Sequence, residues 1–341
     1  MFVILNDSKA TPYDMTTAQI LATTGTTKTW KMQQLFGLGL SRREVATLMN
    51  VGYGFAQNVY AAWVEARATR ALVTPAPAAT AAALAPYTVA AFTRSFGVEI
   101  EAYGVTRETL LAELRAQGLE AHGEGYNHST RSHWKIVSDA SVSGAHAFEL
   151  VSPVLRGYEG LEDLARACRA LKNTGAQVND SCGLHVHLGA QDLTVENMRQ
   201  LFRNYLVLET SIDKLVPASR RGSANTYCKS LQRARTMAAA EQQILAATTA
   251  EQLSAAANGG CRYHKVNFQS YRRQGTIEFR QHSGTMNFEK ISFWVKFLAN
   301  LVDYSKTRLV TPHLPVAEFT TFNQRDIATF YMRRATALQN R

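Results

Sequence analysis

The chain has 341 residues, of which 46% are hydrophobic and 19% are charged, and 37 lysines and arginines against 27 aspartates and glutamates give a formal net charge of +10. This composition excludes an intrinsically disordered protein, because a chain with so much apolar surface can bury a core. The positive charge favours polyanionic partners, either nucleic acid or phosphorylated ligands.

The chain begins with MFVILNDSKA, which lacks the basic region and the long apolar run of a secretory signal. The longest alanine-rich apolar stretch is interrupted by prolines and is too short to cross a bilayer. The four cysteines form no CxxC pair, so neither a zinc knuckle nor a thioredoxin-type site is predicted. We therefore expect a cytoplasmic protein with reduced thiols and without a membrane partner.

A helical pattern appears in LSRREVATLMNVGYGFAQNVYAAWVEA. Ser41 and Glu44 have the spacing of a capping box, which predicts a short helix over about 42–49. Residues 50–52 predict a tight turn, and a second helix follows from about Gly54. Two helices separated by such a turn resemble the helix-turn-helix of small DNA-binding regulators.

We assign residues 1–73 to a small all-α domain with two open functions. The first is DNA binding, in which polar side chains near the start of the second helix would reach bases or phosphates: Tyr53, Gln57 and Asn58. The second is dimerisation or protein docking, because three-helix units also serve those roles. The proline- and alanine-rich segment 74–86 is predicted to be a linker.

Strands and helices alternate in a larger domain, which we place at 87–310, followed by a C-terminal helical extension at 311–341. Apolar patterning predicts strands at 96–104, 132–141, 145–154, 183–189 and 274–284. Helical spacing, with capping residues at several starts, predicts helices at 106–118, 161–171, 194–208, 287–301 and 327–338.

Polar side chains share one face of several predicted strands. In GLHVHLG, His185 and His187 point to the side opposite their apolar neighbours, and Glu99 and Glu101 do the same in VEIE. Glu149 is the single carboxylate in FELV. One face of TIEFRQH is predicted to carry Thr276, Glu278, Arg280 and His282.

Two interpretations of these faces are open. If they meet on one sheet surface, they form a site of carboxylates and imidazoles, which suits Mg²⁺ or Mn²⁺. Otherwise they are solvent-exposed faces with structurally paired histidines. Many basic residues lie between and within the predicted strands of this site, and they favour the binding of phosphate groups. Some of them are expected to lie on the solvated surface instead. These residues are Arg220, Arg221, Lys229, Arg233, Arg235, Arg262, Lys265, Arg272, Arg273 and Arg280.

The order of the motifs resembles the glutamine synthetase and glutamate–cysteine ligase superfamily. FGVEIE, WKIVSDAS, FELVSPVL, CGLHVHLG and GTIEFRQHSGT together are more similar still to the amidoligase family, over roughly residues 94–310. The resemblance implies an α+β fold in which a twisted antiparallel sheet with flanking helices carries ATP and metal ions. It also implies the metal ligands Glu99, Glu101, Glu149, His185 and Glu278.

The resemblance further implies that Arg280 neutralises the transferred phosphate and that His187 lies near the substrate carboxylate or phosphate. The candidate catalytic residues are therefore Arg280, His187 and Glu278, and the candidate ATP ligands are Arg220, Arg221, Lys229, Arg262, Lys265 and Arg280. Glutamine synthetases carry further glutamates beside the third ligand, where this chain offers only Glu149, with Asp139 as a candidate substitute. The number of metal ions is left open.

These features predict an ATP-dependent carboxylate–amine ligase. Phosphorylation of a carboxylate would give an acyl phosphate, which an amine converts to an amide. Two alternatives remain, namely a DNA-binding regulator whose large domain senses a ligand, and a metal-dependent hydrolase or nuclease. The sequence identifies neither the acid nor the amine, and it is compatible with a homo-oligomer, which is frequent among ligases of this superfamily.

Overall fold

The structure is a computed structural model that describes residues 17–38, 40–70, 87–310 and 314–339, and of 64–70 the backbone alone. The predicted linker 74–86 and the two ends of the predicted N-terminal domain, 1–16 and 71–73, lie outside the described residues. The chain divides into two compact units, Met1–Ala82 and Ala83–Arg341.

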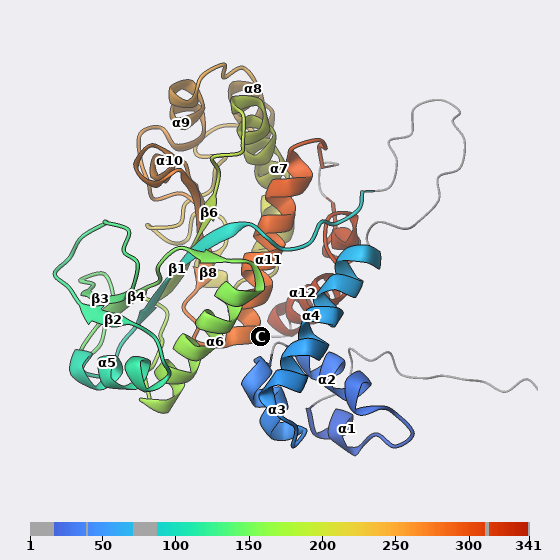
Figure 1. The fold of residues 1–341 in the computed structure, drawn as a ribbon. Coiled ribbons are helices and arrows are strands. Elements are labelled where there is room, and N and C mark those ends of the chain that lie inside the picture. Colours follow the sequence, from blue (N-terminus) through green and yellow to red (C-terminus); the bar gives the residue numbers. More distant parts are fainter. Residues whose placement is uncertain (1–16, 39, 71–86, 311–313, 340–341) are drawn as a thin grey trace, which may run out of the picture. The chain divides into compact units, whose positions relative to one another are not determined.

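The described part of the first unit consists of helices α1 (Thr17–Ala22), α2 (Lys28–Gly37), α3 (Arg42–Leu48) and α4 (Tyr53–Arg70), drawn in blue in Figure 1. The predicted capping box is confirmed, because the Ser41 side chain accepts a hydrogen bond from Glu44 N while the Glu44 carboxylate accepts one from Ser41 N. Asn50 tolerates the positive φ of 46° in the turn before α4. The unit has its own small core: Ile20, Met32, Leu35, Phe36, Val45, Ala46, Ala56 and Val59.

The second unit is built on an eight-stranded sheet in the order β2-β3-β4-β1-β6-β8-β7, with β5 paired to β1. The strands are β1 (Ser95–Ala102), β2 (Ala121–Gly123), β3 (Trp134–Ser138), β4 (Phe148–Val151), β5 (Leu155–Arg156), β6 (Gly183–Gly189), β7 (Val266–Asn267) and β8 (Thr276–Ser283). The antiparallel sheet implied by the resemblance is corrected to a mixed sheet, because β2 and β3 are parallel. The loop 124–133 returns the chain so that β3 starts beside the start of β2.

The helices of this unit are α5 (Arg107–Ala116), α6 (Gly157–Asn173), α7 (Val195–Asp213), α8 (Met237–Leu245), α9 (Ala250–Asn258), α10 (Gln269–Gln274), α11 (Phe288–Ser305) and α12 (Arg325–Gln339), with short 3₁₀ segments η2 (Ala218–Arg220) and η3 (Val316–Thr321). Thr106, Thr194 and Asn287 cap α5, α7 and α11 as predicted. None of the helices in the described residues has the length and apolar character that a membrane span requires.

One face of the sheet carries the apolar residues of the strands, and α6, α7 and α11 lie along the sheet in Figure 1. Alternation puts Val98, Ile100, Leu184 and Val186 into one continuous core with residues of these helices. The same alternation leaves the glutamates and histidines of β1 and β6 on the opposite face. The periodicity of two in the sequence therefore separates the core from the candidate site.

The segment predicted as a C-terminal extension shares this core. Phe319, Phe322 and Tyr331 pack around Phe297 of α11, with ring centroids 5.3, 5.5 and 5.1 Å from that of Phe297. Loss of a buried aromatic side chain of this kind typically costs about 3–5 kcal/mol. The C-terminal helix is thus a packed part of the second unit.

The register of β8 against β6 shifts between Leu184 and Val186, so that β8 contains an extra residue. His282 pairs with Leu184, which faces the core, and its ring lies 5.4 Å from that of Trp294. The prediction that His282 shares a face with Glu278 is therefore wrong, because one extra residue reverses the alternation. Burial lowers the pKa of His282 to about 3 and keeps the ring neutral.

Candidate active site

The central strands β1, β6 and β8 bring three carboxylates around one imidazole. His185 Nδ1 lies 2.9 Å from Glu99 Oε2 and 3.7 Å from Glu278 Oε1, and His185 Nε2 lies 3.5 Å from Glu101 Oε1. The exposed fractions are 4% for His185, 6% for Glu101 and 3% for Glu278. The antiparallel register, in which Glu99 is opposite His185, creates this arrangement.

Neighbouring groups fix the carboxylates of this cluster. The backbone N–H of Gly183 donates to Glu101 Oε2 at 2.6 Å, and the side-chain amide of Asn267 donates to Glu278 Oε2 at 2.6 Å. A Cβ atom on Gly183 would lie only 3.1 Å from His185 Nε2 and 3.3 Å from Glu101 Oε2. The glycine therefore permits the close approach of these side chains.

Glu149 joins the cluster from β4, where it is opposite Glu101. Burial raises the pKa of Glu149 well above its usual range, and the carboxylates of Glu99 and Glu101 raise it further. Burial also opposes ionisation of Glu99, but the imidazoles of His187 and His185 outweigh it and hold the pKa of Glu99 well below its usual range. The neighbouring carboxylates thus oppose the ionisation of Glu149.

Asp139, the candidate substitute for the further glutamates of glutamine synthetases, hydrogen-bonds locally. Its Oδ1 atom accepts hydrogen bonds from Ser141 N at 2.7 Å and from Ser141 Oγ at 2.6 Å, as in a local turn. Asp139 contributes to the site only by raising the pKa of Glu149 through its charge.

Two overlapping groups have the chemistry of a site for divalent cations. The ligand atoms lie within 4.8 Å of one another in each group, which are Glu99, His185 and Glu278, and Glu101, Glu149 and His185. Several carboxylates with one imidazole form a donor set that suits Mg²⁺ or Mn²⁺. The residues present therefore fit the metal ions that the resemblance implies, and a cation would relieve the repulsion among the carboxylates.

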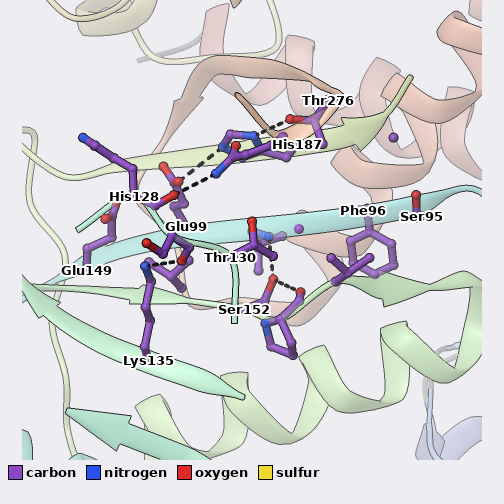
Figure 2. A pocket seen from close by; sticks show the side chains of 18 of the residues that line it. Ser95, Phe96, Glu99, His128, Thr130, Lys135, Glu149, Ser152, His187 and Thr276 are labelled. Carbon is purple, nitrogen blue, oxygen red and sulfur yellow. Dashed lines mark hydrogen bonds and ion pairs between the residues drawn. The ribbon is translucent and has the colours of Figure 1, made fainter. Parts of the chain in front are cut away.

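A pocket of about 120 Å³ lies beside this cluster, and Figure 2 shows His187 there between Thr276 and Glu99. His187 Nδ1 is hydrogen-bonded to Thr276 Oγ1 at 3.0 Å, and His187 Nε2 lies 3.2 Å from Glu99 Oε1. Burial lowers the pKa of His187, but Glu99 and Glu278 outweigh burial and raise it above its ordinary value. The His187 imidazole therefore borders both the pocket and the carboxylates, which favour its protonated form.

The loop 124–133 forms another wall of the pocket. The ammonium of Lys135 donates to Asn127 O at 3.1 Å, to Asn127 Oδ1 at 2.9 Å and to Ser129 O at 2.8 Å, and Lys135 is only 3% exposed. Sequence reasoning missed Lys135. The alternation in WKIVS could have revealed it, because Trp134 and Ile136 are core residues and the lysine between them must face the site.

Arg280 of β8 lies next to the cluster and is 8% exposed. Its Nη1 atom forms an ion pair with Glu278 and lies 3.5 Å from His185 Nδ1, and its Nε donates to Tyr227 O at 3.2 Å. The guanidinium also lies 5.9 Å from the ring centroid of Tyr263. Burial raises the pKa of Glu278, but Arg280 and His187 outweigh it and bring that pKa to about 2.

Two of the other candidate ATP ligands lie near the site. Arg220 is 3% exposed, and its Nη1 lies 3.3 Å from the position that a Cβ on Gly183 would take. Arg262 Nη1 lies 3.3 Å from Nε2 of His128, a residue of the pocket wall. These two arginines therefore add positive charge near the carboxylate cluster.

The remaining candidates have other partners in the structure. The ammonium of Lys265 lies 2.8 Å from Glu209 and 2.6 Å from Asp213, because a fully buried lysine requires such anionic partners. Arg221 Nε donates instead to Val216 O at 2.9 Å. Lys229 is exposed and pairs through its backbone with the segment of His264.

Comparison with known proteins yields a family match over residues 93–302, to the family described as "Putative amidoligase enzyme". Among solved structures, a bifunctional glutathione synthetase from Pasteurella multocida is 13% identical with a TM-score of 0.30, and the similarity covers 72% of this chain and 42% of that protein. A TM-score this low supports no argument about the function. No curated protein matches the chain. Because the family match spans more than half of the sequence, the chain belongs to the amidoligase family.

Proposed function

We propose that the second unit is an ATP-dependent carboxylate–amine ligase. The observation that carries the proposal is the buried cluster in which Glu99, Glu101 and Glu278 surround His185, with Arg280 beside it. This combination of clustered anions and an adjacent guanidinium suits the handling of a metal–nucleotide complex. Mg²⁺ or Mn²⁺ held by these residues and Glu149 would offset the charge of the phosphate oxygens.

The proposed reaction has two steps. First, a carboxylate oxygen of the acid substrate bonds to the γ-phosphorus of ATP, and the bond between that phosphorus and the β,γ-bridging oxygen breaks to release ADP. Second, the amine nitrogen bonds to the acyl carbon, the bond from this carbon to the phosphate oxygen breaks, and the nitrogen loses a proton. The products are an amide, ADP and phosphate.

The chain's own cationic side chains support both steps. Because Glu278 is held on its other oxygen by Asn267, Arg280 can turn a donor to the transferred phosphoryl group without leaving Glu278 unpartnered. His187 borders the pocket next to Glu99, so a hydrogen-bond donor of its ring suits a carboxylate or phosphate oxygen of the reacting groups. Donors fixed in advance stabilise charge that develops in the transition state.

Two tyrosines next to Arg280 suggest where the nucleotide base binds. The rings of Tyr227 and Tyr263 are 5.2 Å apart in an edge-on contact, and Tyr227 is 43% exposed. Arg262 also lies over the Tyr263 ring, at 5.2 Å from its centroid. An exposed aromatic surface flanked by guanidinium groups favours stacking of a base, with the phosphates directed toward Arg280.

The decisive experiment follows oxygen atoms. Phosphate release is first screened over amino acids, other small carboxylic acids, amines and polyamines, with mass spectrometry of the products. The acid that supports turnover is then labelled with ¹⁸O in its carboxylate. An acyl phosphate delivers one labelled oxygen to phosphate, so unlabelled phosphate would disprove this mechanism. Turnover without ATP would favour the hydrolase or nuclease alternative.

We also propose that the first unit directs the ligase to nucleic acid. Near the turn between α3 and α4, Tyr53, Gln57 and Asn58 are exposed, and the Arg43 guanidinium lies 5.9 Å from the Tyr53 ring centroid. An exposed cationic and aromatic surface suits phosphates and bases. Dimerisation is the competing function, because the apolar side chains of Leu48 and Phe55 are exposed nearby.

A further inference from the structure

A second group of metal-ligating side chains lies at the β2 edge of the sheet, outside the candidate active site. Ligand atoms of Glu120, His122 and His133 all lie within 4.8 Å of one another. The rings of His122 and His133 have centroids 4.3 Å apart, at an interplanar angle of 66°. We call these three residues the edge cluster.

The strand register explains why they meet. Glu120 directly precedes β2 and His122 lies within it, so the alternation of an extended chain puts both side chains on the same face. The parallel pairing of β2 with β3 places His122 opposite Lys135, which is two residues from His133 and therefore on its face. Side chains from both ends of the loop 124–133 are thus brought together by backbone pairing.

A fourth residue fixes one of these rings. Glu124 Oε1 lies 2.9 Å from His133 Nε2 and 3.0 Å from Arg131 Nε. His133 Nδ1 has no partner among the residues that the structure describes, so it is available to bind a cation. A carboxylate hydrogen-bonded to the other nitrogen of a ligating histidine is a frequent feature of metal sites, because it holds the ring in place.

We propose that Glu120, His122 and His133 form a binding site for a transition-metal ion, with Zn²⁺ as the expected ion. Two imidazoles and one carboxylate favour Zn²⁺ over Mg²⁺, and a site with three protein ligands leaves a fourth position to water. The edge cluster thereby differs from the central cluster, which is dominated by carboxylates.

The ion would join the short strand β2, of only three residues, to the end of the loop 124–133. A three-residue edge strand has few backbone hydrogen bonds with which to resist fraying. The same loop supplies Asn127, His128, Ser129 and Thr130 to the wall of the active-site pocket. Metal binding at the edge therefore stabilises the shape of the pocket without contact with the reacting groups.

The test measures metal binding to the full-length protein after treatment with a chelator. Co²⁺ is titrated in excess Mg²⁺, which is added to fill the oxygen-rich central cluster. Visible absorption reports nitrogen-containing coordination, and Zn²⁺ is titrated in parallel by calorimetry. We expect one equivalent of each ion to bind at the edge. His122→Ala and His133→Ala should each abolish this equivalent, and Glu124→Gln should weaken it by about tenfold to a hundredfold.

Two controls make the result specific. His146→Asn removes another exposed histidine, and asparagine tolerates the positive φ of 54° at that position, so this variant should bind like the wild type. Glu278→Gln alters the central cluster and should retain the edge equivalent. Because the His122 and Glu120 side chains are 49% and 70% exposed, their substitution should leave the free energy of unfolding nearly unchanged.

Absence of the equivalent in the wild type, or its persistence in both His122→Ala and His133→Ala, would overturn the proposal. Limited proteolysis gives an independent readout, since Zn²⁺ should protect the loop 124–133 in the wild type and not in His122→Ala. None of these measurements depends on ligase activity, so their failure would leave the proposed function untouched.

Discussion

The two units of this chain hold their candidate functional side chains in opposite environments. In the second unit, Glu101, His185 and Glu278 are 3–6% exposed, and both carboxylates lie within 4 Å of the His185 ring. In the first unit, Tyr53 is 43% exposed and Gln57 is also exposed. Removal of a buried charge leaves its partners uncompensated, whereas water and salt screen an exposed one. Substitutions should therefore have large effects in the second unit and small, graded effects in the first.

The largest effect is expected at the central carboxylates. Glu99→Gln and Glu278→Gln retain the shape of each side chain but remove the negative charge from the proposed metal ligands. Turnover of Mg·ATP should fall by about a hundredfold or more. Steady-state phosphate release measures the loss, and Mn²⁺ titration should show weaker binding in both variants.

Glu251→Gln is the matched control, because this carboxylate is exposed at the start of α9. Circular dichroism should show that all three variants are folded. If Glu99→Gln and Glu278→Gln retain wild-type turnover, buried charge does not mark the active site and the comparison between the units fails.

The next effect concerns Arg280. Arg280→Lys preserves the charge but loses the fork of donors that can contact Glu278 and a phosphoryl group together. We expect kcat to fall, and KM to change less than kcat. The fall in kcat should be smaller than the loss of about a hundredfold that is typical when a transition-state donor is removed altogether. Arg272→Lys, at an exposed position of α10, should have no effect. If Arg280→Lys and the wild type have equal kcat values, Arg280 contributes only its positive charge and not a specific contact with the phosphoryl group.

A smaller effect is expected at Tyr227, which belongs to the second unit but is 43% exposed, unlike the buried residues of the central cluster. Tyr227→Ala removes the proposed stacking surface and should raise the KM for ATP by about tenfold, since stacking on an aromatic residue contributes about 1–3 kcal/mol per base. Leu245→Ala, at an exposed apolar side chain at the end of α8, is the control. An unchanged KM in Tyr227→Ala would place the base elsewhere.

Much of the central cluster could be predicted from sequence because burial and alternation act together there. Polar residues at every second position of β1 and β6, between core residues, can face only one surface of the sheet. The position of His282 could not be predicted, because the extra residue of the bulge arises from pairing between two distant strands. The ion pair of Lys265 could not be predicted for a similar reason, because its partner Glu209 lies 56 residues away in α7.

The mixed sheet also depends on such distant contacts. The parallel pairing of β2 with β3 follows from the path of the loop 124–133, and a three-residue strand has too little pattern to be recognised. The edge cluster was missed with it, because Glu120, His122 and His133 share no short motif. In the first unit α3 and α4 were predictable from a capping box and apolar spacing, whereas α1 and α2 were not predicted. Exposed residues of this unit give no periodic signal of what they bind.

The bulge itself can be tested through pH. Burial, followed by the charge of Arg334, depresses the pKa of His282 from 6.5 to about 3. Below about pH 6.5 the unfolded chain binds a proton at this histidine and the folded protein does not, so acid favours unfolding. Between these two pKa values, each pH unit of acidification should lower the free energy of unfolding by about 1.4 kcal/mol through His282.

Urea unfolding of wild type and His282→Gln at neutral pH and about two pH units lower measures this dependence. The variant should lose less stability on acidification than the wild type, whereas His146→Asn should match the wild type because His146 is exposed. Parallel pH profiles for His282→Gln and wild type would mean that His282 is not on the core face.

The smallest effects are expected in the first unit, where Arg43 and Gln57 are exposed. Arg43→Ala should weaken binding of duplex DNA by a few-fold and reduce the dependence of log Kd on log salt by about one, as expected when one phosphate contact is lost. Gln57→Ala should weaken binding without changing this slope, because a neutral side chain releases no counterion. Lys28→Ala removes the same charge from another exposed position, at the start of α2, and separates a local contact from the general effect of net charge. Anisotropy titrations at two salt concentrations distinguish these outcomes. If the full-length protein binds no DNA, or Arg43→Ala and Lys28→Ala have equal effects, nucleic-acid binding by this surface is excluded, and the exposed Leu48 and Phe55 point to a contact with a second chain.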